Sequence, residues 1–172
     1  MDTLFPVSGG VSAANVVVED ARPQDMAAVQ AIYAPHVLQG LATFEEQPPS
    51  VDEMTRRREA VLALGLPFLV ARQSGAVVGY CYAGPYGTRS AFRYCLEDSI
   101  YVDAHCHGRG IGRALLDFCR STRNTLSVDV NEQNPQAVGF YLHYGFVQTG
   151  RSPLDGEGRP FPLLHMALPD KA

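Results

Sequence analysis

The chain has 172 residues, which is enough for one domain with a sizeable core and too few for two domains of typical size. Its formal net charge of -4 argues against nucleic acid as a partner, because phosphate binding needs a basic surface. The sequence has no apolar run of about eighteen residues that could span a membrane, and residues 1–15 lack the basic and apolar regions of a signal peptide. We therefore expect a flexible tail over residues 1–15, a single domain over residues 16–170 and a cytoplasmic location.

The cysteines do not indicate a metal site or a disulfide framework, because none of them forms a Cys-x-x-Cys pair. His105-Cys106-His107 offers metal-binding side chains, but adjacent residues point in different directions and cannot easily converge on one ion. We expect no metal. We expect small core roles for Cys81, Cys95 and Cys119.

The first predicted elements are a strand and a helix. Residues 16–21 have the β-branched composition of a strand. Pro23 and Asp25 then begin a helix that ends at Gly40. Its apolar residues recur at helical spacing: Met26, Val29, Ile32 and Tyr33.

A second helix is predicted after a loop over residues 43–49. Ser50 precedes Glu53 by three residues, which is the spacing of a capping box. Residues 56–58 are three arginines, and this charge run predicts a solvated helix face.

A hairpin and a further strand follow. Residues 67–71 and 77–83 are apolar runs on either side of the turn at residues 73–75. Residues 97–102 form the next predicted strand.

The second half of the chain alternates helices and strands. Helices are predicted over residues 111–120 and 135–143, and strands over residues 125–130, 146–149 and 162–168. The predicted order along the whole chain is β-α-α-β-β-β-α-β-α-β-β.

The most informative motif is His107-Gly108-Arg109-Gly110-Ile111-Gly112, which joins the strand at residues 97–102 to a helix. Glycines at every second position let the backbone approach a bulky anion closely. The N–H groups and the dipole of the new helix favour that anion. The motif therefore predicts a seat for a pyrophosphate.

Other interpretations of this loop are possible. A Walker A loop would need a lysine, but the chain contains only Lys171. A dinucleotide fingerprint would need a third glycine where Arg113 stands, although Asp129 lies roughly where a ribose-binding acid would be expected. A tight structural turn without a ligand is a further alternative.

The loop resembles the acyl-CoA loop of the GNAT acetyltransferases, Gln/Arg-x-x-Gly-x-Gly/Ala, and departs from it only at His107. The element order resembles the GNAT fold over nearly the whole chain after the tail. The resemblance implies an α/β (α+β) fold, a mixed and mostly antiparallel sheet with helices on both faces. It also implies acetyl-CoA as co-substrate.

Residues 21–102 resemble the phosphinothricin acetyltransferase branch of this family, through Tyr82-Ala83-Gly84-Pro85-Tyr86 and Glu97-Asp98-Ser99-Ile100-Tyr101-Val102. That resemblance implies acetylation of the α-amino group of phosphinothricin, methionine sulfoximine or methionine sulfone. Residues 125–168 resemble another group of small bacterial GNAT enzymes, through residues 130–141 and 150–165. The chain is therefore hybrid-like, and Tyr141 stands where the phosphinothricin branch carries a histidine.

The resemblance also implies roles for individual residues. Tyr141 would protonate the leaving thiolate, because a phenol with a reference pKa of about 10 is protonated at neutral pH. Glu97 would be the base that acts on the acceptor, directly or through a water. Asn134 would contact the CoA arm. The alternatives are a packing aromatic for Tyr141, a strand-end carboxylate for Glu97 and a helix N-cap for Asn134.

The remaining cofactor contacts that the resemblance implies come from Tyr101, Val102, His107, Gly108, Arg109, Gly110, Ile111, Gly112 and Arg113. Arginine can bind an acceptor's carboxylate with two hydrogen bonds, and aromatic rings can form apolar walls. The predicted substrate-binding residues are Phe44, Tyr86, Arg89 and Arg93. The alternatives are another small amine or a protein N-terminus as acceptor, or a CoA-binding module without catalysis. A homodimer is a further expectation.

Overall fold

A computed structural model describes residues 15–39, 43, 45–85, 96–122, 127–155 and 158–169. Four strands form one antiparallel sheet in the order β1-β2-β3-β4. They are β1 (Val16–Asp20), β2 (Phe68–Gln73), β3 (Ala76–Pro85) and β4 (Leu96–Val102). The tight turn between β2 and β3 places Ser74 and Gly75 at positive φ, 52° and 84°, as a two-residue hairpin requires.

Three further strands form a second antiparallel sheet in the order β5-β7-β6. They are β5 (Ser127–Asn131), β6 (Val147–Ser152) and β7 (Leu163–Ala167). The β6–β7 register shifts between Gln148 and Gly150, which marks a bulge in β6.

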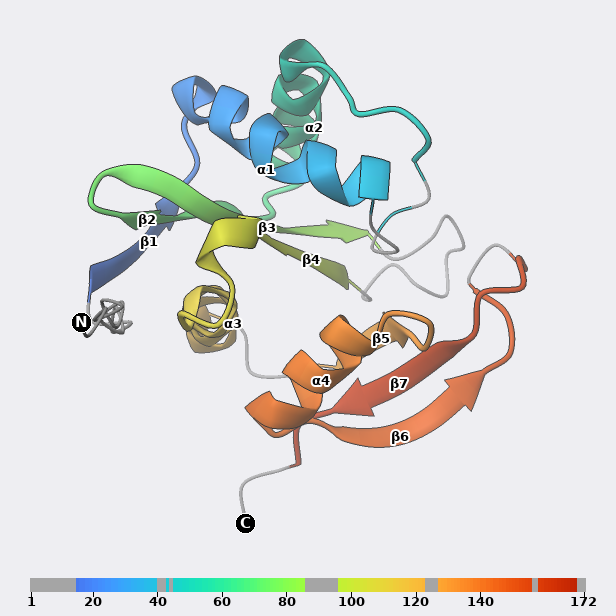
Figure 1. Cartoon of the computed structure of the whole chain (residues 1–172). Helices are drawn as coiled ribbons and strands as arrows, with labels where there is room; N and C mark the ends of the chain where they lie inside the picture. Colours follow the sequence, from blue (N-terminus) through green and yellow to red (C-terminus); the bar gives the residue numbers. More distant parts are fainter. Residues whose placement is uncertain are drawn as a thin grey trace, which may run out of the picture.

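The helices lie on both sides of the sheets (Figure 1). They are α1 (Met26–Gln39), α2 (Val51–Ala63), α3 (Ile111–Thr122) and α4 (Pro135–Tyr144). Tyr101 of β4 packs into the core beneath α1 and α2. Its neighbour Ile100 contacts both the α3 core and the α4 core. Because successive strand residues face opposite sides, α3 and α4 share the side opposite α1 and α2.

The predicted order of helices and strands is confirmed. A short 3-10 helix at Pro23–Asp25 precedes α1, so the regular helix begins only at Met26. Strand β6 extends to Ser152, beyond the predicted end, because it pairs with β7 as far as Leu163. No helix of the described ranges is long and apolar enough to cross a membrane.

Two expectations about α2 need correction. The Ser50 hydroxyl accepts from the Glu53 N–H at 3.1 Å, as predicted. The Glu53 side chain, however, bonds to Arg56 and Arg57. The arginine run is also not simply a solvated face, because the Arg58 guanidinium donates to the Ala21 carbonyl at 2.7 Å.

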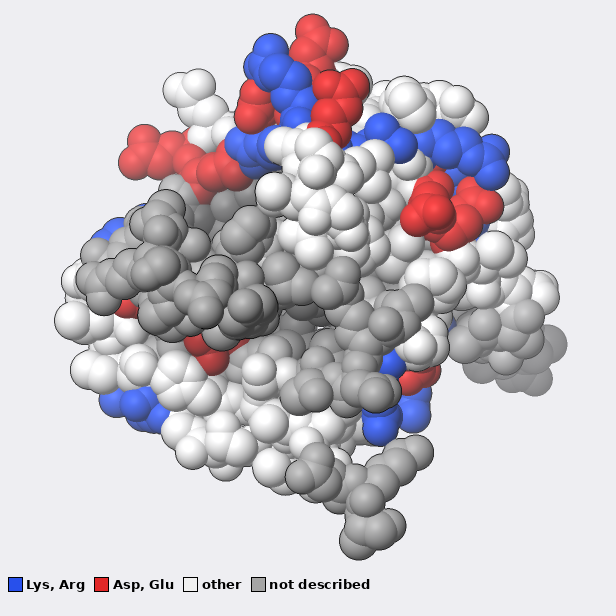
Figure 2. Space-filling view, turned by 180° about the vertical axis from the view of Figure 1, so that it is seen from behind, with Lys and Arg blue, Asp and Glu red and all other residues white. Residues whose placement is uncertain are grey.

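Figure 2 shows one face of the molecule, on which basic and acidic side chains mostly adjoin each other. Several described ion pairs are exposed, for example Arg56 with Glu53 at 2.6 Å and Arg151 with Glu132 at 2.7 Å, whereas the pair of Arg72 with Asp25 is largely buried. Exposed pairs like these contribute little to stability.

Candidate functional site

The glycine-rich loop follows the end of β4 and a short 3-10 helix at Ala104–Cys106. Gly108 and Gly110 adopt φ of +73° and +79°, a conformation that glycine adopts without strain. The Ala114 N–H donates to the Gly110 carbonyl at 2.9 Å, so the N–H groups of residues 111–113 have no partner within the helix. A Cβ at Gly108 would meet no atom within 4 Å, which leaves room for a bulky anion. The chain thus fits a pyrophosphate at this place.

The third glycine of the motif has a different role. A Cβ at Gly112 would lie 3.1 Å from Cε2 of Phe140 and 3.8 Å from Cγ2 of Val102. The missing side chain therefore lets α3 pack closely against α4 and the end of β4. Close packing, and not access for the anion, explains the glycine at this position.

His107 lies between the end of β4 and α4. Its Nε2 donates to the Val102 carbonyl at 3.0 Å, and its Nδ1 accepts from the Gln136 amide at 3.1 Å. The Asp103 N–H bonds to Val78 on β3, so the Val102 backbone points toward the other edge of β4. Both nitrogens of the His107 ring thus bond to groups of the protein. The ring lies at the edge of β4 where the pantetheine arm is expected.

His36 of α1 approaches the same strand end. Its ring packs against Tyr101 with a centroid distance of 5.3 Å. Burial lowers the pKa of His36, a hydrogen bond with the Val102 backbone opposes this effect, and His107 adds to it. The neutral form of the His36 ring is therefore favoured. Sequence reasoning had not identified His36 as a residue of this site.

Tyr141 of α4 is buried, with 9% of its surface exposed. Its ring packs edge-on against Phe140 at 5.1 Å and Phe146 at 5.3 Å. The packing role is therefore present, and the role as an acid stays a prediction. Asn134 accepts from the Ala137 N–H at 3.1 Å, so the N-cap interpretation is confirmed.

The predicted acceptor residues are less fully described. Phe44, Tyr86, Arg89 and Arg93 lie outside the described residues. Glu97 lies in β4 opposite Gly84 of β3, and its side chain is outside the description. Tyr101 has its side chain in the core beneath α1, and its backbone faces β3, so a cofactor at the outer edge of β4 would meet the neighbouring Val102 backbone instead.

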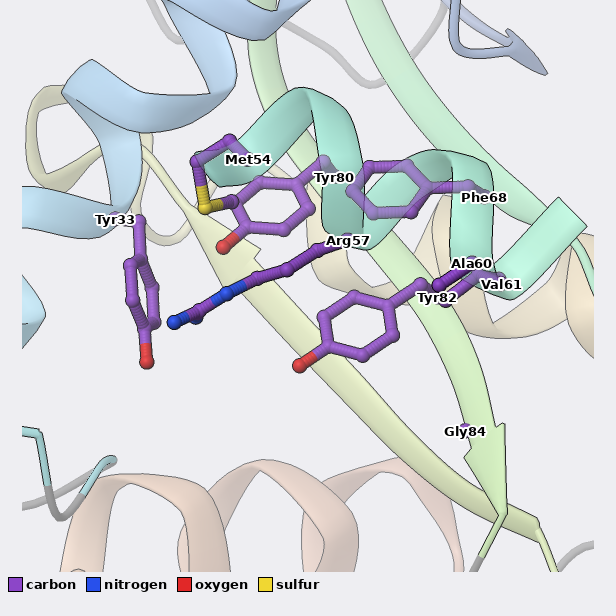
Figure 3. Close-up of a pocket in the computed structure, with 9 residues that line it drawn as sticks. All are labelled: Tyr33, Met54, Arg57, Ala60, Val61, Phe68, Tyr80, Tyr82 and Gly84. Carbon is purple, nitrogen blue, oxygen red and sulfur yellow. The ribbon is translucent and has the colours of Figure 1, made fainter. Parts of the chain in front are cut away.

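A cavity of about 270 Å³ lies between α2 and strands β2 and β3. Phe68 stacks on Tyr80 at 5.8 Å and on Tyr82 at 5.3 Å, and these rings line the cavity together with Met54 and Val61. Tyr80 and Tyr82 direct their hydroxyl groups toward the end of the cavity where the Arg57 guanidinium lies (Figure 3). The Tyr80 hydroxyl is buried and has no hydrogen-bond partner.

Arg57 belongs to a network at this end of the cavity. Its guanidinium donates to both oxygens of Glu45, at 2.7 and 3.1 Å, and to Glu53 at 3.1 Å. The hydrogen bond from Arg57 lowers the pKa of Glu45. The Tyr33 hydroxyl donates to Glu45 at 2.9 Å, and burial raises the pKa of Tyr33. The Arg57 charge is therefore already paired.

Sequence reasoning missed a second polar cluster, on the C-terminal sheet. His165 of β7 lies between Asp129 of β5, at 2.6 Å, and Ser152 of β6, at 2.7 Å. The alternation of apolar and polar residues in Val128-Asp129-Val130 and Leu164-His165-Met166 could have placed Asp129 and His165 on one face. Which strands neighbour each other could not be deduced from that pattern.

The comparisons with known proteins agree with this geometry. A family model described as acetyltransferase (GNAT) domain matches residues 65–148. A phosphinothricin N-acetyltransferase of Alcaligenes faecalis is 42% identical over 139 residues, which cover 77% of this chain and 71% of that protein. The chain belongs to the GNAT family of acetyltransferases. The predicted family, fold and enzyme class are thereby confirmed.

A second GNAT relative is of another kind. Peptidyl-lysine N-acetyltransferase YjaB of Escherichia coli K12 is 47% identical over 70 residues, 41% of this chain and 48% of that protein. The two relatives agree with the hybrid-like character expected from the sequence. The solved structure of a phosphinothricin acetyltransferase from Sinorhizobium meliloti, in complex with AcCoA, has a TM-score of 0.75 and 31% identity. The match covers 92% of this chain and 91% of that one.

Proposed function

We propose that this GNAT enzyme transfers the acetyl group of acetyl-CoA to the amino group of a small amino-acid-like acceptor, of the phosphinothricin or methionine sulfoximine type. The observation that carries the proposal is the loop at Gly108 and Gly110, which opens α3 at the end of β4 with free N–H groups. The names of the phosphinothricin N-acetyltransferase relatives support the acceptor class.

The glycine-rich loop and the edge of β4 would bind different parts of acetyl-CoA. The N–H groups of residues 111–113 would hold the pyrophosphate, with Gly108 and Gly110 allowing its close approach. The outward-facing N–H of Val102, whose carbonyl already accepts from His107, would bond the pantetheine arm, beside Tyr101 and Asn134. Arg109 is exposed, and Arg113 pairs with Asp117 only at 3.7 Å, so both side chains can turn toward phosphate oxygens.

The chemical step needs a base for the acceptor and an acid for the leaving sulfur. Glu97 is the proposed base and Tyr141 the proposed acid. The pairing of Glu97 with Gly84 supports this choice of base, because Gly84 lines the cavity beside α2. The cavity would then hold the acceptor's side chain while its amino group reaches the thioester.

The volume of the cavity suits such a side chain. About 270 Å³ is several times the roughly 30 Å³ that one water occupies in the liquid. The aromatic walls favour an apolar stem, and the Tyr80 hydroxyl can donate to an oxygen at its end. Phe44, Tyr86, Arg89 and Arg93 remain the proposed contacts to the rest of the acceptor.

A second candidate function is acetylation of a protein amine. The observation in its favour is the similarity to the peptidyl-lysine acetyltransferase YjaB over 70 residues. A CoA-binding module without turnover is the non-enzymatic alternative that sequence reasoning left open. We further propose a cytoplasmic location and a homodimer, both to be checked on the isolated protein and in cells.

The deciding experiment is a screen for acetyl-CoA-dependent thiol release. Methionine sulfone, methionine sulfoximine and phosphinothricin should release thiol faster than polyamines, aminoglycosides or lysine peptides. Glu97→Gln should lower turnover by about 100-fold or more, with an upward shift of the pH optimum. Tyr141→Phe should lower turnover with less effect on acetyl-CoA affinity. Tight calorimetric binding of NADH without binding of CoA would contradict the proposal.

A further inference from the structure

Three polar side chains on neighbouring strands of the C-terminal sheet form one continuous hydrogen-bonded chain. Nδ1 of His165 lies 2.6 Å from Oδ1 of Asp129, and Nε2 lies 2.7 Å from Oγ of Ser152. Serine, histidine and carboxylate are connected here through the same atoms as in the triads of serine hydrolases. None of these three residues is among those that sequence reasoning assigned to catalysis.

The strands are shaped to hold the imidazole in place. Gly150 of β6 stands opposite His165 in the register, directly after the bulge. A Cβ at Gly150 would come within 3.2 Å of Cδ2 of His165, so a side chain at this position would displace the ring. Bulges often redirect side chains beside active sites. The ring is thus positioned by backbone shape as well as by two hydrogen bonds.

The direction of the hydrogen bonds follows from the chemistry of the groups. An ionised Asp129 only accepts, so Nδ1 of His165 carries the hydrogen. The neutral ring then accepts at Nε2, and the Ser152 hydroxyl donates to it. The serine oxygen keeps its lone pairs for a donor from outside. The chain is therefore arranged to take up a proton at Ser152, with the Asp129 carboxylate stabilising the resulting imidazolium.

The chain lies on the side of the molecule that the acceptor is proposed to occupy. Val128, Leu164 and Met166 pack into the core with Tyr141 of α4. Their neighbours Asp129 and His165 therefore face the opposite side of the sheet, which is the side of α1, α2 and the cavity. The side chains of His165 and Asp129 are 36% and 29% exposed, so the chain can be reached.

Acetylation of an ammonium requires two deprotonations of its nitrogen. One precedes attack on the thioester carbon, and the other follows formation of the N–C bond as the C–S bond breaks. An imidazole, with a reference pKa of about 6.5, is a stronger base than a carboxylate, with a reference pKa of about 4.3. It is therefore the better acceptor for a proton from an ammonium group. A second proton acceptor beside Glu97 is therefore chemically useful.

We propose that the Ser152–His165–Asp129 chain takes the first of these protons. The ammonium gives a proton to Oγ of Ser152 while the hydroxyl proton of Ser152 moves to Nε2 of His165. The neutral amine then attacks, Glu97 takes the second proton and Tyr141 protonates the thiolate. Glu97 afterwards returns its proton to Tyr141 through water, and His165 releases its proton to water. This inference rests on the proposed function.

The test uses the full-length enzyme with methionine sulfone and acetyl-CoA. Ser152→Ala, His165→Ala and Asp129→Asn should each lower kcat by on the order of 100-fold, with acetyl-CoA affinity and melting temperature unchanged. Added imidazole should restore part of the activity of His165→Ala and none of that of Glu97→Gln. Arg151→Gln, next to Ser152 on the other face of β6, is the matched control and should keep wild-type kcat.

The outcomes separate the relay from the proposed function. A wild-type enzyme that acetylates no amino-acid analogue overturns both. An active wild type whose three variants keep their kcat overturns the relay alone. The relay is also overturned if the variants lose acetyl-CoA affinity or thermal stability, or if imidazole gives no rescue, because the cluster would then be structural.

Discussion

The two sheets of this enzyme are covered differently by helices. In β2, Phe68, Leu69, Val70 and Ala71 are each at most 2% exposed, because α1 and α2 pack on one face and α3 on the other. In β5, Val128 is buried and Asp129 is exposed, because the described helices that contact this sheet, α4 and α3 through Leu116, pack on the same face. The difference indicates that the first sheet supplies stability, whereas the second can carry accessible polar groups on its open face.

The largest effect that would test this comparison is expected at Phe68, which is 1% exposed. Phe68→Ala should lower the free energy of unfolding by about 4 kcal/mol, since it empties a ring-sized space in the first sheet. Val147→Ala on β6 removes a side chain that is 47% exposed and should cost less than about 0.5 kcal/mol. Denaturant unfolding of both variants measures the difference. Equal costs would contradict the assignment of stability to the first sheet.

Asp25 tests how the first sheet treats a polar group, since this carboxylate is 4% exposed. Burial acts to raise the pKa of Asp25, but hydrogen bonds from Arg72 at 2.7 Å and from the Arg22 N–H at 2.9 Å outweigh it, so the pKa lies below 3.8. A carboxyl whose pKa is lower in the folded than in the unfolded protein stabilises the fold at pH values above its unfolded pKa. This stability is lost as the pH falls through the folded pKa.

Asp25→Asn should therefore lower the free energy of unfolding by about 3 kcal/mol at neutral pH. This is the low end of the range for a buried ion pair, because Arg72 would still pair with Glu19. The cost should shrink as the pH falls below about 4. Unfolding at a series of pH values measures it. A cost that does not change with pH would show that the charge of Asp25 is not what stabilises the fold.

Gly79 and Gly84 are two positions of β3 that differ in how closely other residues pack against them. A Cβ at Gly79 would lie 2.9 Å from Cγ2 of Ile111 and 3.1 Å from the Tyr101 carbonyl, whereas one at Gly84 would meet nothing within 4 Å. Gly79→Ala should cost about 2 kcal/mol by overpacking, and Gly84→Ala should change stability by less than about 0.5 kcal/mol. Thermal unfolding of the pair decides whether α3 packs as closely on β3 as described.

The smallest effect is expected at Tyr80, a polar exception within the buried face of the first sheet. Because its hydroxyl has no partner, Tyr80→Phe should leave stability unchanged or raise it by about 1 kcal/mol. Burial raises the pKa of Tyr80, so the phenol stays a neutral donor. If an oxygen of the acceptor accepts a hydrogen bond from the Tyr80 hydroxyl, Tyr80→Phe should lower kcat/KM for methionine sulfone about tenfold. The value of kcat/KM for methionine should stay the same.

A matched control for Tyr80→Phe is Tyr144→Phe, which removes a hydroxyl bonded to Asp117 on the far side of the sheets. It should leave the ratio between the two acceptors unchanged. A loss of stability in Tyr80→Phe, without a change in that ratio, would show that the cavity does not hold the acceptor's side chain.

The residues that could be predicted are those whose role is local. The glycine loop was identified from sequence because positive φ and free N–H groups depend on neighbours within a few residues. The Asn134 cap was identified for the same reason. The packing role of Gly112 was missed, because Phe140 approaches it from another helix.

The sequence by itself determined the order of the elements, the family and the glycine-rich loop, since periodicity and turn chemistry act between near neighbours in the chain. Only the tertiary structure decided which polar groups meet. Asp129, Ser152 and His165 are brought together by the strand order β5-β7-β6, across separations of 36 and 13 residues. Arg57 of α2 is paired with Glu45, 12 residues earlier in the chain, although the arginine run alone predicted only a solvated face. Such contacts depend on which surfaces are buried against each other, and no local pattern encodes them.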